Sequence, residues 1–198
     1  MKLLMNTTSP YARIVRIGLL EKGVEAEMQI VNPWGDTPEL LAANSAGRVP
    51  TLITDDGLAL TESLLILHWL ESARPAPSFL GTDPTAELAR AGVAMGVIDA
   101  AVHIMIGRVI SGVSFDAAPV GLRRRRSIVD GLKRLDSALL DGSGVNAPAV
   151  SAITAITALD YVRFRFPDVD WLPATPNLDR LREHYSQRPA FALTAPHA

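Results

Sequence analysis

Ser9 is the first residue whose type and position could support chemistry, because it directly precedes Pro10. Proline is favoured in the first turn of a helix, so Ser9 occupies the predicted cap. A hydroxyl and the backbone amides of a helix N-terminus can together stabilise an anion. A serine here is also a common cap without any chemistry. Thr8 is the main rival donor, Thr7 is a more distant one, and Tyr11 lies inside the helix, where aromatic side chains often belong to the core.

Two later segments carry residue types suited to a charged ligand. Arg48 precedes Val49-Pro50 and could bind a carboxylate, although a solvated arginine is the ordinary alternative. Glu62 and Ser63 stand where a predicted hairpin ends and a helix begins, and the amides there favour an anion. A plain helix cap with an acidic residue in the first turn is the alternative.

Periodicity predicts the elements that would hold these residues. Residues 2–5 form a short apolar run, and a helical pattern follows from Pro10 to a stop at Gly23. A second strand at 26–30 completes a βαβ unit, which implies parallel pairing. A short helix at 37–43 precedes two strands, 51–54 and 58–60, whose Asp55-Asp56-Gly57 link is a strong hairpin signal. A further helix ends before Arg74, so the order is βαβαββα.

The second half of the chain is predicted to be all-helical. Residues 77–85 are rich in turn formers and are interpreted as a linker. Helices are expected at about 88–109, 122–140, 151–164 and 178–187. We therefore expect an α/β domain at 1–76, a linker at 77–85 and an all-α domain at 86–198.

Composition excludes several classes of protein. The 198 residues are 48% hydrophobic and 20% charged, with a formal net charge of -2, so no global attraction to nucleic acid is expected. The absence of cysteine excludes disulfides, thiolate metal sites and a cysteine nucleophile. The four histidines lack metal-site spacing, and the arginine run 123–126 is predicted to be a solvated helix face. No apolar run is expected to span a bilayer, which favours a cytoplasmic protein without a membrane partner.

Four short motifs together resemble the bacterial cytosolic glutathione transferases: TSPYAR at 8–13, NPWG at 32–35, GRVP at 47–50 and TES at 61–63. Three later segments, LDY at 159–161, FRFP at 164–167 and RPAF at 188–191, are similar to the late helices of that family. The resemblance implies an N-terminal thioredoxin-like domain that holds glutathione and a C-terminal all-helical transferase domain. It also implies a homodimer with a role in detoxification.

The resemblance also implies the chemistry, which is conjugation of the glutathione thiolate to small hydrophobic electrophiles. A thiol with a pKa of about 8.5 must be shifted downward to react at neutral pH. Ser9 matches the position of the serine or cysteine that acts on the sulfur. A cis Val49-Pro50 bond would turn the backbone of Val49 toward the cysteinyl part of glutathione.

The remaining contacts are assigned by the same resemblance. Arg48 would reach the glycine carboxylate, Ser63 the γ-glutamyl carboxylate, and Glu62 the ammonium group. The implied glutathione site is Thr8, Ser9, Arg48, Val49, Pro50, Glu62 and Ser63, and the implied electrophile pocket includes Tyr11, Trp34 and His103. Glutathione is the expected co-substrate, and no metal is expected.

Departures from the family pattern leave alternatives open. Relatives often carry an aspartate where Met95 stands, so a contact with glutathione in the partner subunit is expected to be absent or moved to Asp99. Without cysteine, mixed-disulfide chemistry is not expected. A glutathione-dependent lyase, isomerase or dehalogenase remains an alternative, as does a non-catalytic binding protein with the transferase fold.

Overall fold

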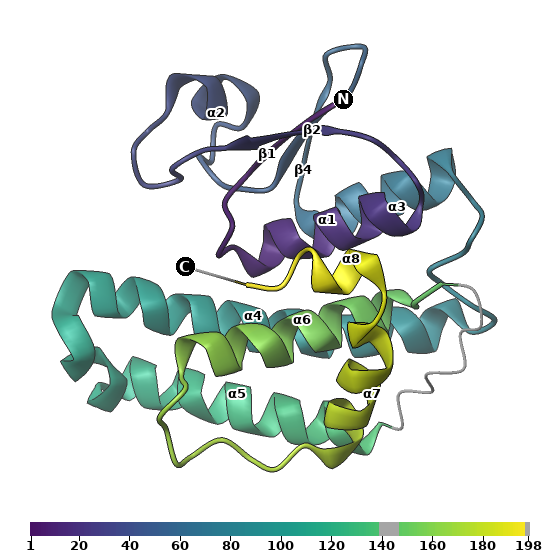
Figure 1. Cartoon of the computed structure of the whole chain (residues 1–198). Coiled ribbons are helices and arrows are strands. Elements are labelled where there is room, and N and C mark those ends of the chain that lie inside the picture. The colour runs from purple at the N-terminus through teal and green to yellow at the C-terminus, as the bar shows by residue number, and fades with distance from the viewer. Residues whose placement is uncertain (139–146, 197–198) are drawn as a thin grey trace. The chain divides into compact units, whose positions relative to one another are not determined.

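The computed structural model describes residues 1–138 and 147–196, which form two compact units (Figure 1). One unit contains Met1–Phe79 together with Gln187–Ala198, and the other contains Leu80–Ser186. The sequence predicts domain boundaries at 76 and 86. That the parts on either side fold independently stays a prediction. The grouping of the last residues with the N-terminal unit was not expected from the sequence.

A four-stranded sheet lies at the centre of the N-terminal unit, in the order β2-β1-β3-β4. Its parallel pair is β1 with β2, whereas β3 runs antiparallel to both β1 and β4. This sheet confirms the predicted thioredoxin-like arrangement of strands. The strands are β1 (Lys2–Met5), β2 (Glu27–Ile30), β3 (Thr51–Ile53) and β4 (Ala59–Thr61).

Helices cover both faces of this sheet. The helices α1 (Pro10–Glu21) and α3 (Ser63–Ala73) lie on one face, and α2 (Pro38–Ala43) lies on the other (Figure 1). Because successive strand residues point to opposite faces, β1 supplies side chains to both layers. Leu4 packs with Leu40 of α2 and with Val49, whose side chain is thereby held in the core. Gly18 allows α1 to approach α3 closely, since a Cβ there would collide with the side chain of Leu67.

The C-terminal segment is fixed to α1. The Nε and one terminal nitrogen of the Arg188 guanidinium donate to the two oxygens of the Glu21 carboxylate, at 2.9 and 2.6 Å. The Arg16 guanidinium donates to the carbonyl oxygen of Leu193 at 3.1 Å. Burial, with a smaller effect from Arg13, lowers the pKa of Arg16. These bonds connect residues far apart in sequence and explain why the short helix α8 (Pro189–Ala192) belongs to the N-terminal unit.

The other unit is built around two long helices. Its elements are α4 (Pro84–Ser111), the 3-10 helix η1 (Gly112–Ala117), α5 (Pro119–Ser137), α6 (Val150–Arg165) and α7 (Pro176–Ser186). The helix α4 packs against both α5 and α6, and α6 is buried along its length from Val150 to Val162. The Asp136 carboxylate of α5 caps α7 by accepting from the amides of Asn177 and Leu178, at 2.8 and 2.9 Å.

The helical prediction for the second half is therefore confirmed in outline. Helices α4, α5 and α7 begin two to four residues earlier than expected, and η1 was not predicted. The expected end of the second helix at 139–140 lies outside the described residues.

The stretch Pro84–Ala117 overturns the expectation that no apolar run approaches the length of a membrane span. Its most apolar window has a mean hydropathy of 1.8, so by length and composition it could cross a bilayer. Polar residues interrupt the apolar sequence of α4, so a search for an uninterrupted apolar run does not detect this stretch. A core helix passes the same test, and α4 packs on two neighbours in its own unit.

Candidate active site

The strand register brings three predicted site segments to one end of the sheet. Leu4 of β1 lies opposite Thr51 of β3, and Thr51 lies opposite Thr61 of β4. Neighbouring strands are about 4.8 Å apart, so these three positions form a short row across the sheet. From that row, β1 leads within five residues to Ser9, β3 is entered through residues 48–50, and β4 leads directly into residues 62–63. Residues distant in sequence therefore meet at this end.

Ser9 is the N-cap of α1, as predicted. Its hydroxyl oxygen accepts a hydrogen bond from the amide of Ala12 at 3.2 Å. This bond uses a lone pair of the oxygen and not the hydroxyl hydrogen. The capping role therefore leaves Ser9 able to donate to an anion at the helix N-terminus.

Thr8 uses its hydroxyl differently. The side-chain oxygen of Asn6 accepts from the Thr8 amide at 3.0 Å and from the Thr8 hydroxyl at 2.8 Å. Because the backbone amide can only donate, the shared atom of Asn6 must be the oxygen, so the hydroxyl also donates to it. Thr8 would have to break this bond to donate to a ligand, which distinguishes it from Ser9.

The bond between Val49 and Pro50 is cis, as the resemblance implied. Asn44 holds Arg48, the residue before Val49, since the side-chain nitrogen of Asn44 donates to the carbonyl oxygen of Arg48 at 2.9 Å. The Thr51 hydroxyl donates to the same oxygen at 3.0 Å. Outside the strand ladders, none of the hydrogen bonds found in residues 1–138 and 147–196 uses the backbone N–H or C=O of Val49. These groups are thus available for strand-like pairing.

Glu62 adopts an unusual backbone conformation at the start of α3. Its φ is +65° and its ψ is 115°, a region that non-glycine residues avoid at a cost of about 1–3 kcal/mol. Its side chain makes no cap bond to α3; instead its carboxylate binds the Arg48 guanidinium at 2.9 Å. Both side chains are largely exposed, at 57% and 69%, so this pair contributes little stability. Strained backbone of this kind often occurs at functional sites.

Ser63 is the first residue of α3 and is only 3% exposed. The start of α3 is therefore buried at this residue. Since the side chain of the N-cap residue Glu62 makes no hydrogen bond to α3, the amides of its first turn lack the kind of cap that Ser9 gives α1. Such a helix start suits a bound carboxylate.

The chain is similar to known proteins along its whole length. Residues 8–73 match the family model described as the glutathione S-transferase N-terminal domain. An uncharacterized GST-like protein, YibF of Escherichia coli K12, is 30% identical over 200 residues, covering 99% of this chain and 98% of that protein. The chain belongs to the glutathione S-transferase family.

Two further relatives indicate the range of this family. A glutathione S-transferase from Methylobacterium radiotolerans, solved in complex with glutathione sulfonate, has a TM-score of 0.87 and 34% identity. The alignment covers 100% of this chain and 95% of that one. Maleylacetoacetate isomerase of Pseudomonas aeruginosa is 39% identical over 93 residues, which are 44% of this chain and 43% of that protein.

The residues predicted for the electrophile pocket belong to three different segments of the chain. Tyr11 is half-buried in α1, whereas Trp34 is 66% exposed in the turn after β2. His103 is exposed on α4, in the other unit, where its Nδ1 lies 2.6 Å from the carbonyl oxygen of Asp99. The part that these three residues play in this glutathione S-transferase family member stays a prediction.

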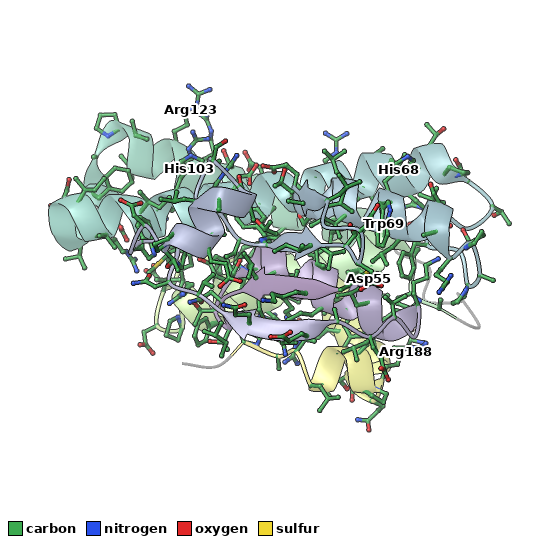
Figure 2. All side chains as sticks on the ribbon, turned by 90° about the horizontal axis from the view of Figure 1, so that it is seen from above. Asp55, His68, Trp69, His103, Arg123 and Arg188 are labelled. Carbon is green, nitrogen blue, oxygen red and sulfur yellow. The ribbon has the colours of Figure 1, made fainter. Side chains whose placement is uncertain are left out.

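Two grooves of the N-terminal unit lie away from the predicted site. One, of about 710 Å³, is lined by the end of α1 and the start of β2, and a second, of about 320 Å³, includes Asp55 and Trp69 (Figure 2). Their lining residues include Met1, at the opposite end of β1 from Ser9. Within the described ranges, no group of three or more His, Asp or Glu side chains is placed to hold a metal ion.

Sequence reasoning missed the two asparagines that shape the site. Asn6 organises the loop before Ser9, and Asn44 fixes the loop before Val49. Asparagine two residues before an amide donor is a typical side-chain turn, and Asn44 also accepts from the amide of Ala46 at 3.0 Å. That local signal could have identified both loops, although not the contact of Asn44 with Arg48.

Proposed function

We propose that this glutathione S-transferase family member binds glutathione at the end of the sheet where Ser9, Val49 and Glu62 converge, and transfers its thiolate to small hydrophobic electrophiles. The observation that carries the proposal is the row Leu4–Thr51–Thr61, because it joins three motifs that are separate in sequence. The relative from Methylobacterium radiotolerans, solved with glutathione sulfonate, supports the choice of ligand.

Each end of glutathione has a complementary group in this region. The backbone of Val49 can pair with the cysteinyl residue in the manner of an added strand. The first-turn amides of α3, with Ser63, suit the γ-glutamyl carboxylate, and Glu62 suits the ammonium group. Arg48 suits the glycine carboxylate. Arg48 and Glu62 bind each other at 2.9 Å, so glutathione would exchange this exposed pair for two charged contacts with the ligand.

Ser9 would act on the sulfur. A hydrogen bond from its hydroxyl, together with the positive end of α1, favours the thiolate over the thiol and lowers the thiol pKa. With an aryl halide, the thiolate forms a carbon–sulfur bond, the carbon–halogen bond breaks and halide leaves. The thiol proton is released to solvent when the thiolate forms.

A glutathione-dependent isomerase is the second candidate. The similarity of 93 residues to maleylacetoacetate isomerase favours it. In such a reaction the same thiolate would add to a double bond, the resulting single bond would rotate, and the thiolate would leave again. A binding protein without turnover is the third.

Two measurements separate these functions. Retention on immobilised glutathione, followed by release of halide from 1-chloro-2,4-dinitrobenzene, would support the transferase. Conversion of maleylacetoacetate without net consumption of glutathione would favour the isomerase. Retention without either reaction would favour the binding protein, and failure to bind glutathione would contradict the proposed site.

A further inference from the structure

The end of the helical unit where α4 turns into α5 displays an unusual amount of apolar surface. We call this region the α4–α5 end. Its most exposed aliphatic residues are Val109 at 73%, Ile110 at 78% and Val113 at 78%, and Val120 and Leu122 of α5 follow at 54% and 51%. Five large aliphatic side chains within fourteen residues form a cluster, unlike the single exposed apolar residues that are normal on protein surfaces.

The backbone that carries these residues is held in place. The Arg108 guanidinium binds both carboxylate oxygens of Asp116, linking α4 to η1. The Phe115 ring occupies the space beside Gly107 where a Cβ would stand, and Gly121 makes a similarly close approach to the carbonyl oxygen of Phe115. The exposed side chains therefore project from a fixed turn.

Positive charge lies directly beside this apolar cluster. Two exposed arginines of α5, Arg123 and Arg126, stand close to Val120 and Leu122, whereas the exposed Asp130, Lys133 and Arg134 lie further along the helix. Arg123 follows Val120 by three residues and Arg126 follows Leu122 by four, so each lies one helical turn from an exposed aliphatic side chain. Figure 2 shows the Arg123 side chain extending away from the ribbon. Apolar and cationic groups thus share one surface.

We propose that the α4–α5 end docks on anionic lipid surfaces. Aliphatic side chains would enter the interface between headgroups and acyl chains, while the arginines would bind the lipid phosphates. Nucleic acid is disfavoured, because its recognition relies on polar, stacking or aromatic groups rather than on a cluster of aliphatic residues. The Phe115 ring is packed beside Gly107, and Trp171 already lies beneath Arg125 at 4.8 Å, so neither ring is free to stack on a base. The proposal concerns attachment at the surface and does not depend on glutathione chemistry.

Sedimentation with lipid vesicles tests the proposal on the full chain. We expect binding to vesicles of phosphatidylglycerol with phosphatidylcholine, little binding to phosphatidylcholine alone, and weaker binding as salt rises. Ile110→Ser should weaken binding about tenfold, and Arg123→Gln about fivefold. Leu88→Ser and Arg180→Gln are matched controls, since both residues are exposed elsewhere in the same unit. Circular dichroism should show that all four variants fold alike.

Several results would overturn the proposal. Equal binding to both kinds of vesicle, no binding to either, or an equal loss in the control variants would each contradict it. Tighter binding to duplex DNA than to anionic vesicles would show that the surface serves nucleic acid. If Ile110→Ser lowered the mass of the protein in sedimentation without lipid, the cluster would be an interface between copies of the chain.

Discussion

Among the single residues, Ser9 has a hydroxyl that can both accept and donate a hydrogen bond, and the accepting function is already in use. It accepts from Ala12 as a helix cap, and this leaves its hydrogen available for a sulfur anion. Thr8 donates to Asn6 instead, so two adjacent hydroxyl residues that look interchangeable in the sequence are not equivalent. The proposed chemistry depends on this difference.

Replacement of Ser9 by alanine should raise the pKa of bound glutathione thiol by about one unit, the effect of losing a charge-assisted hydrogen bond worth roughly 1.5 kcal/mol. A bond to the thiolate stabilises the deprotonated form, so its loss moves the rate profile to higher pH. The defect should be largest near neutral pH and shrink as pH rises, with glutathione affinity nearly unchanged. Conjugation rate against pH measures this.

The variant also loses a helix cap, which costs about 1 kcal/mol of stability. Asp83→Ala is the matched control, because Asp83 caps α4 by accepting from the amide of Ala86 at 3.0 Å and lies in the other unit. It should lose stability without a change in the rate profile. An unchanged profile in Ser9→Ala would transfer the role to Thr8, Tyr11 or the helix amides.

Glu62 allows a test that separates binding from stability. Glycine accepts a φ of +65° without steric cost, so Glu62→Gly should raise the free energy of unfolding by up to about 1 kcal/mol. The same change removes the proposed partner of the glutathione ammonium and should weaken binding by about 1–3 kcal/mol. Urea unfolding and calorimetric titration measure the two effects. Undiminished affinity would place the γ-glutamyl site elsewhere.

Among the elements, η1 can pack closely against α4 and α5 because glycines lie where it approaches each helix. A Cβ at Gly121 would collide with the backbone carbonyl of Phe115, which cannot move without shifting the turn. Gly121→Ala should therefore cost about 1–3 kcal/mol of stability. Gly92→Ala, inside α4 with nothing within 4 Å of its Cβ position, should instead stabilise by up to about 1 kcal/mol. Equal effects of the two substitutions in thermal unfolding would contradict this account of the turn.

The end of α3 is held by an ion pair that responds to acid. The buried Lys22 ammonium binds the Glu71 carboxylate at 2.7 Å and the carbonyl oxygens of Arg74 and Pro77. Burial acts to raise the pKa of Glu71, but hydrogen bonds from Lys22, Ser78 and the Phe79 amide hold it below its usual value of 4.5. The pair therefore stabilises the fold above that value and loses its effect as pH falls through the lowered pKa.

Glu71→Gln should lower the free energy of unfolding by about 3 kcal/mol near neutral pH, because it leaves the Lys22 ammonium buried without its counter-charge. Toward strongly acidic pH the difference from wild type should shrink, since the wild-type carboxyl then becomes protonated. Urea unfolding at several pH values measures this. Glu25→Gln, at an exposed position, is the control, and a constant difference across pH would contradict the assignment.

For the assembly of complete chains, we predict a symmetric homodimer, which is the commonest form among soluble oligomers. The resemblance assigns its surfaces to the region near Glu62 and to the helix that carries Met95. Leu58 and Leu65, each 63% exposed, lie on either side of Glu62 in sequence and provide apolar area for such an interface. Leu65→Arg should convert a dimer into a monomer in analytical ultracentrifugation, whereas Leu193→Arg should not. A wild-type monomer at micromolar concentration would contradict the prediction.

The amino-acid sequence was enough to predict the βαβαββα order of the N-terminal half, the four longer helices of the second half and the three motifs of the candidate site, but not η1 or α8. Periodicity, turn residues and helix caps depend on neighbours within a few positions, so β1, α1 and the hairpin at Asp55-Asp56-Gly57 could be predicted from local pattern. The resemblance added the cis bond before Pro50.

Which groups remain available for a ligand depends on the folded structure. That the Arg48 side chain binds Glu62, that Ser63 is buried, and that residues after Gln187 join the N-terminal unit all depend on contacts between segments distant in sequence. The same holds for the exposure of Ile110. Local propensity does not encode such contacts, because a hydrogen bond or a buried face requires a partner that only the folded chain brings near.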